Sequence, residues 1–132
     1  MTPARLSTRS GDMAQARTRR RVAEKYLEVA DLISSEDGLA INICVAVAVL
    51  AGIAAGDAIC LASTGRRYSG DDHTAAATLL AQTDSAAGKQ LRKLVSFKPG
   101  SHYGDHLLEA HDRTSALRAA RALVANANKR TT

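Results

Sequence analysis

The chain has 132 residues, which suits one domain, and its 45% apolar and 23% charged residues exclude a disordered chain. The net charge of +5 comes entirely from residues 1–25, which carry seven Arg and Lys against two Asp and Glu. The rest is neutral, with eleven residues of each sign, which excludes a uniformly basic domain. With no Trp and one Phe, the core must use small aliphatic side chains, which bury less area each. We therefore expect the domain to bury more surface by forming a homodimer.

The N-terminal arm, residues 1–12, shows no hydrophobic periodicity, so we expect it to be disordered. Its charge fits two interpretations: contact with the phosphates of a nucleic acid, or a solvated tail that leads into a charged helix face. The arm lacks the apolar segment of a secretion signal, and we therefore expect a cytoplasmic protein.

Helical periodicity fills most of the remaining chain, which we expect to form one helical domain over residues 13–128 and a frayed tail over 129–132. No segment alternates with a period of two, so we expect no sheet and an all-α fold. The expected helices span about 14–34, about 37–63, from Asp72 to a break near Asp84, about 86–97 and about 112–128.

The stretch over residues 39–62 is apolar and long enough to cross a membrane, but we expect it to be the central core helix. It is mostly Ala, Val and Gly, and it contains Asn42 and Asp57, which are costly in a bilayer. Gly52 and Gly56 leave a smooth groove for close approach of another helix, within the chain or across a dimer.

Cys44 and Cys60 lie in the same apolar stretch. Sixteen residues of helix place them about 24 Å apart along the axis, too far for a disulfide. We expect two buried free thiols, as in a reducing compartment.

The segment 65–73, GRRYSGDDH, carries the strongest chemical signal. Arg66 and Arg67 stand just before an expected helix N-terminus, which favours anions, and guanidinium groups suit phosphate. His73, in the first turn, titrates near neutral pH and can move a proton. The alternative is that the arginines pair with the two aspartates that follow them, and that His73 is only an exposed first-turn residue.

The order of these elements resembles the HEPN superfamily (higher eukaryotes and prokaryotes nucleotide-binding domains) over residues 14–128. The resemblance rests on an amphipathic first helix, a long Ala-rich second helix, and an Arg…His element that opens the third. The last helix, RTSALRAAR from Arg113, follows a Lys- and Tyr-containing segment from Lys98 to Asp105. The family motif is an Arg, four to six residues and a His; five residues separate Arg67 from His73. The implied fold is a four-to-five-helix antiparallel bundle that dimerises.

Active members of this family are metal-independent endoribonucleases, often toxins of toxin–antitoxin pairs or defence effectors, and their two Arg…His elements meet at the dimer cleft. The resemblance implies that Arg67, or Arg66 in the other register, binds the scissile phosphate. It implies that His73 acts as general base or acid for attack by the RNA 2′-hydroxyl, which leaves a cyclic phosphate. One of the two following aspartates would orient His73. The implied substrate-binding residues are Arg66, Tyr68, Asp71 and Asp72.

The other histidines, His102, His106 and His111, lie near several acids, and a metal site can be drawn among them. Their spacing aligns ligands only on a helix, and Tyr103-Gly104 argues against one there. We therefore expect no metal and no cofactor.

Asp57 is a carboxylate inside an apolar helix, so it needs a partner or solvent. It either lines the dimer cleft and pairs with an arginine near the Arg…His element, or it is a partly exposed or structurally hydrogen-bonded residue.

Three functions remain open. The first is a HEPN-type endoribonuclease, the second a nucleotide- or RNA-binding module without turnover, and the third a helical subunit of another protein. The expected partners are a second copy, RNA or a nucleotide, and a cognate antitoxin or a nucleotidyltransferase, with no membrane.

Overall fold

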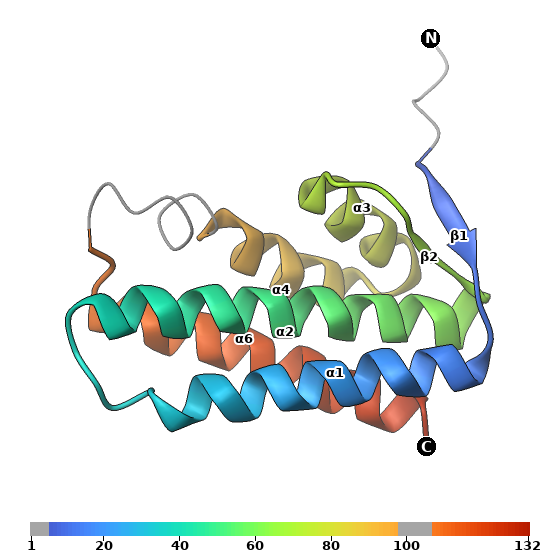
Figure 1. The fold of residues 1–132 in the computed structure, drawn as a ribbon. Helices are drawn as coiled ribbons and strands as arrows, with labels where there is room; N and C mark the ends of the chain where they lie inside the picture. The colour runs from blue at the N-terminus through green and yellow to red at the C-terminus, as the bar shows by residue number, and fades with distance from the viewer. Residues whose placement is uncertain (1–5, 98–106) are drawn as a thin grey trace, which may run out of the picture.

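The computed structural model describes residues 6–97 and 107–132. This part of the chain is mostly helical and forms a five-helix compact domain with a small two-stranded hairpin (Figure 1). In chain order the elements are β1 (Thr8–Ser10), α1 (Met13–Leu32), α2 (Leu39–Thr64), β2 (Arg66–Tyr68), α3 (His73–Thr83), α4 (Ser85–Ser96) and α6 (Ala110–Arg130). The helical bundle is confirmed, with helix ends that differ from the predicted ones by a few residues.

Helix α2 is the centre of the domain. It contacts α1, α3, α4 and α6, and Figure 1 shows it in green with α1 running alongside. Among the described residues, it is the one helix that is long and apolar enough to cross a membrane. Most of its surface is buried against the neighbouring helices. Most of its buried residues are small, namely Ala, Gly, Val and Cys, which lets the surrounding helices approach closely.

The two glycines of α2 face other helices of the same chain. A Cβ on Gly52 would collide with Leu94 of α4, and one on Gly56 would lie 3.2 Å from Leu91 and 3.3 Å from Leu80. The predicted close approach of helices is therefore found within the chain.

Helix α1 begins with a capping box. The Asp12 carboxylate accepts from the Gln15 backbone N–H, and the Gln15 side chain accepts from the Asp12 backbone N–H, both at 2.9 Å. The helix buries Ala16, Ala23 and Ala30 in a narrow stripe with a seven-residue spacing. Such small residues allow α1 to pack closely along α2.

The expectation of an all-α fold without a sheet is wrong in one place. Strands β1 and β2 pair antiparallel, with Arg9 opposite Arg67. Gly65, at φ 73°, ends α2 in the left-handed conformation, and its carbonyl accepts from the Gly11 backbone N–H at 2.9 Å. Part of the arm expected to be disordered is therefore a strand fixed to the end of α2.

The C-terminal tail also differs from the expectation of fraying. Helix α6 continues to Arg130, and Thr131 is fully buried, with its hydroxyl donating to the Ala127 carbonyl at 2.8 Å. The Thr131 carbonyl accepts from Arg17 Nε at 3.1 Å, which ties the end of the chain to α1.

Candidate functional site

The two arginines of β2 point to different partners. The Nε of Arg66 donates to the Thr8 hydroxyl at 2.8 Å, within the hairpin. The Nη1 of Arg67 donates to Oδ2 of Asp57 on α2 at 3.2 Å. Successive residues of a strand project to opposite faces, so only Arg67 is turned toward the helices. Of the two registers that the sequence left open, the one with Arg67 places its guanidinium in a pocket.

Asp57 is the anchor of this region. It is buried on α2, and its Oδ2 also accepts from Arg19 of α1, at 3.2 Å from Nε and 3.0 Å from Nη2. Of the partners that the sequence left open for Asp57, the structure shows two arginines. Burial raises the pKa of Asp57 above its ordinary value, and the charges of Arg19 and Arg67 oppose that increase without cancelling it.

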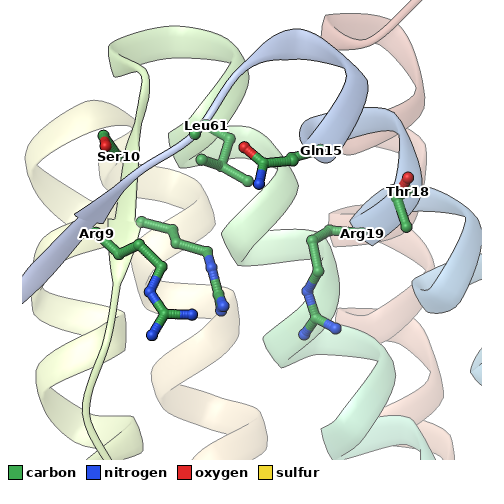
Figure 2. Close-up of a pocket in the computed structure, with 8 residues that line it drawn as sticks. Arg9, Ser10, Gln15, Thr18, Arg19 and Leu61 are labelled. Carbon is green, nitrogen blue, oxygen red and sulfur yellow. The ribbon is translucent and has the colours of Figure 1, made fainter.

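A pocket of about 190 Å³ lies between the hairpin and the N-terminal half of α1. Figure 2 shows the side chains of Arg9, from β1, and Arg19, from α1, both directed toward this space. Its lining residues are Arg9, Ser10, Gly11, Gln15, Thr18, Arg19, Leu61 and Arg67. Three of the lining residues are cationic and none is acidic, so the pocket has the composition of an anion site.

His73 is the first residue of α3. The helix start is held by Asp72, whose Oδ1 accepts from the backbone N–H groups of Thr74 at 3.0 Å and Ala75 at 3.3 Å. The Tyr68 hydroxyl accepts from the Asp72 backbone N–H at 3.3 Å, which closes the turn between β2 and α3. This turn places the Tyr68 hydroxyl beside Asp72, and His73 follows Asp72 in the chain.

The predicted site residues are therefore only partly assembled. Arg67 lines the pocket and His73 does not, while Arg66 lies with Thr8 and Asp71 is exposed. The alternative interpretation required the arginines of β2 to pair with Asp71 or Asp72. Within residues 6–97 and 107–132, neither arginine forms such an ion pair.

Sequence reasoning missed Arg9 and Arg19. Arg9 belongs to the arm that was expected to be disordered, and Arg19 is one of several arginines on a charged helix. The basic arm itself was the available signal, but its partner strand lies almost sixty residues later in the chain. Only the pairing shows that Arg9 reaches the same place as Arg67.

The remaining reactive groups give weaker arrangements. His102 and His106 lie outside the described residues, and His111 is exposed beside Glu109 and Asp112, at 3.3 and 3.4 Å. The residues that the structure describes contain no group of three or more potential metal ligands.

Both cysteines are free and buried, as predicted. Burial raises the pKa of Cys44, and burial with the nearby Asp57 charge raises the pKa of Cys60 to about 12. A thiol that stays protonated is a poor nucleophile, so neither cysteine is suited to covalent catalysis.

Comparison of the sequence with protein-family profiles gives no match, and comparison with curated proteins finds no significant relative.

Proposed function

We propose that this chain is a metal-independent endoribonuclease of the HEPN type, in which Arg67 binds the scissile phosphate and His73 transfers the proton. The observation that carries the proposal is the position of Arg67. A buried carboxylate holds it at an open pocket, one short turn before a helix that begins with His73.

Arg67 is suited to the role because its anchor uses few of its donors. Only Nη1 donates to Asp57, so other N–H groups of the guanidinium remain for phosphate oxygens. In the proposed reaction the 2′-hydroxyl oxygen attacks phosphorus, the bond to the 5′-oxygen breaks, and a cyclic phosphate and a 5′-hydroxyl form. Arg67 stabilises the charge that develops on the phosphate oxygens.

His73 supplies the acid–base step. One copy removes the proton of the 2′-hydroxyl, and the second copy in a dimer donates a proton to the leaving 5′-oxygen. Asp72 fixes the first turn of α3 through its cap, which sets where His73 stands relative to Arg67. The reaction needs a 2′-hydroxyl and is therefore restricted to RNA.

The test is incubation of the purified chain with labelled RNA in EDTA, beside His73→Ala and Arg67→Ala. We expect each variant to lower the cleavage rate by about 10²- to 10⁴-fold, as loss of a general acid–base group does. His111→Ala removes an exposed histidine on α6 and is the matched control. Cleavage that survives His73→Ala with an unchanged rate would falsify the assignment.

RNA or nucleotide binding without turnover is the second candidate. It is favoured by a specific observation: the three arginines share the pocket, whereas His73 does not line it. If wild type binds RNA in a manner weakened by Arg67→Ala, but yields no cleavage products with or without divalent metal, this function replaces the first.

A further inference from the structure

The arginine pocket, defined by Arg9, Arg19 and Arg67, carries more positive charge than its neighbours neutralise. Asp57 is the one acid in contact with these arginines within the described part of the chain, and it pairs with Arg19 and Arg67. The side chain of Arg9 is exposed, and it makes no ion pair or hydrogen bond with the residues that the structure describes. Three guanidinium groups against one carboxylate leave an excess of two positive charges around one small pocket.

The hairpin register makes this excess unfavourable without a ligand. Arg9 and Arg67 are directly opposite each other on adjacent antiparallel strands. Like charges in that arrangement repel and destabilise the pair. An anion between them converts the repulsion into attraction, because each guanidinium then donates to the same negative group.

The size and lining of the pocket select the kind of anion. About 190 Å³ is below the roughly 300–1,000 Å³ of sites that enclose a whole small molecule. Apart from the arginines, the rim offers polar groups from Ser10, Thr18 and Gln15. The Gln15 amide oxygen is occupied by the Asp12 backbone N–H, which leaves its amide nitrogen as a donor (Figure 2). Such a site suits one tetrahedral oxyanion whose carrier extends into solvent.

We propose that the arginine pocket binds a single phosphate group, with Arg9 of β1 as its main unpaired ligand and Arg19 and Arg67 as ligands held in place by Asp57. The group belongs to an RNA backbone or to a free phosphate or nucleotide. Assignment to RNA rests on the proposed function, whereas phosphate binding by the pocket does not. In RNA, this phosphate is the one that Arg67 binds for cleavage in the proposed function, so Arg9 and Arg19 are additional ligands of the scissile group.

The experiment measures binding of a fluorescein-labelled single-stranded RNA by anisotropy at several salt concentrations. We expect Arg9→Ala to weaken binding roughly tenfold and to reduce the salt slope by about one, as loss of one phosphate contact does. Arg118→Ala is the matched control, because it removes the same charge from an exposed position between α4 and α6. Equal effects of the two variants would overturn the proposal, since they would report net charge alone.

Inorganic phosphate and a ribonucleoside monophosphate distinguish the sources. A rise in the thermal midpoint of wild type, absent in Arg9→Ala, assigns the site to a free phosphate group; an effect of Arg9→Ala on RNA alone assigns it to the polymer. No effect of Arg9→Ala with any of these probes overturns the proposal.

The proposed function is tested separately from the pocket, because its readout is the cleavage rate of His73→Ala, whereas the readout for the pocket is RNA binding by Arg9→Ala. If wild type does not cleave RNA, the proposed function is wrong, and the pocket proposal is still tested by the binding of Arg9→Ala. Arg9 is exposed and unpaired, so its variant keeps the fold, and circular dichroism at matched temperatures checks this.

Discussion

Asp57 is the residue on which the geometry of the candidate site depends. One buried carboxylate holds two arginine side chains that come from different elements, α1 and β2. Its pKa is raised because the loss of solvation on burial exceeds the stabilisation by the two guanidinium groups. Asp57 therefore orients the site at little net gain in stability, as is common for buried ion pairs.

This balance predicts the effect of Asp57→Asn. The freed side chains of Arg19 and Arg67 are 31% and 28% exposed, so they can reach water instead of being left buried and unpaired. We expect the free energy of unfolding at neutral pH to change by about 1 kcal/mol or less, well below the roughly 3–5 kcal/mol typical of a fully buried pair. The free energy of RNA binding should change by more than the free energy of unfolding, because Arg67 is no longer held in place by Asp57.

The pH dependence has a definite sign. A carboxyl whose pKa is higher in the folded chain binds more protons there, so its contribution to stability is present at low pH and is lost as pH rises through the folded pKa. We expect wild type to lose stability relative to Asp57→Asn as pH rises from about 4 to about 7, measured by urea unfolding. A difference that is constant over this range, or that changes in the opposite direction, would contradict the raised pKa.

At the scale of elements, glycines set how closely the helices pack. Gly88 of α4 is buried, and a Cβ there would lie 2.6 Å from Cα and 2.8 Å from the backbone nitrogen of Ala81 in α3. Backbone atoms cannot rotate away as a side chain can, so α3 and α4 would have to separate. At Gly56 the nearest atoms are the ends of leucine side chains at 3.2 and 3.3 Å, which need move only slightly.

We therefore expect Gly88→Ala to destabilise the domain by about 1–3 kcal/mol, as overpacking does, even after the gain in helix propensity. Gly56→Ala, the control on α2, should lie within about 1 kcal/mol of wild type. Urea midpoints with unchanged m-values are the measurement. Equal stability of the two variants would show that α3 and α4 can move apart freely.

The elements also show what the sequence can predict. Helices follow from local signals, such as the three- and four-residue spacing of apolar residues, the Asp72 cap and the stop at Gly65. The hairpin does not, because three-residue strands are too short to show alternation and Thr8 pairs with Tyr68 far along the chain. The register of the two strands depends on the packing of α1 against α2, because β1 leads into α1 and β2 follows α2.

The same distinction applies to the candidate site. Arg67 and Asp57 were predicted because each breaks a local pattern, a cation pair before a helix and a charge inside an apolar one. Arg9 and Arg19 could not be predicted as site residues, because nothing in the local sequence distinguishes them from neighbouring arginines. Their role arises from the pairing of β1 with β2 and the packing of α1 on α2.

At the scale of the molecule, most of the exposed large hydrophobic side chains in the described part of the chain belong to α1 and α2, which run side by side in Figure 1. Leu39, Ile43 and Leu50 of α2 are 71%, 55% and 36% exposed. Their spacing of four and seven residues puts them on one face, and a further seven residues lead to Asp57. The exposed apolar face therefore continues toward the arginine pocket.

A second copy of the chain is the partner that we expect for this face. The exposed Leu39, Ile43 and Leu50 lie along one side of α2, so the same apolar surface of two copies can pack together about a twofold axis. The core is built largely from Ala, Val and Leu, so covering this face adds burial that the monomer lacks.

We therefore expect wild type to sediment as a dimer at micromolar concentration and Ile43→Glu to sediment as a monomer. A charge in the middle of an apolar interface should weaken the dimer at least about a hundredfold, equivalent to about 3 kcal/mol. The exposed position of Ile43 in the single chain means that helicity by circular dichroism should be retained. Ala125→Glu places the same charge on an exposed position of α6 and should leave the dimer intact. If wild type is a monomer, or if Ile43→Glu and Ala125→Glu dimerise equally, this face is not the contact between copies.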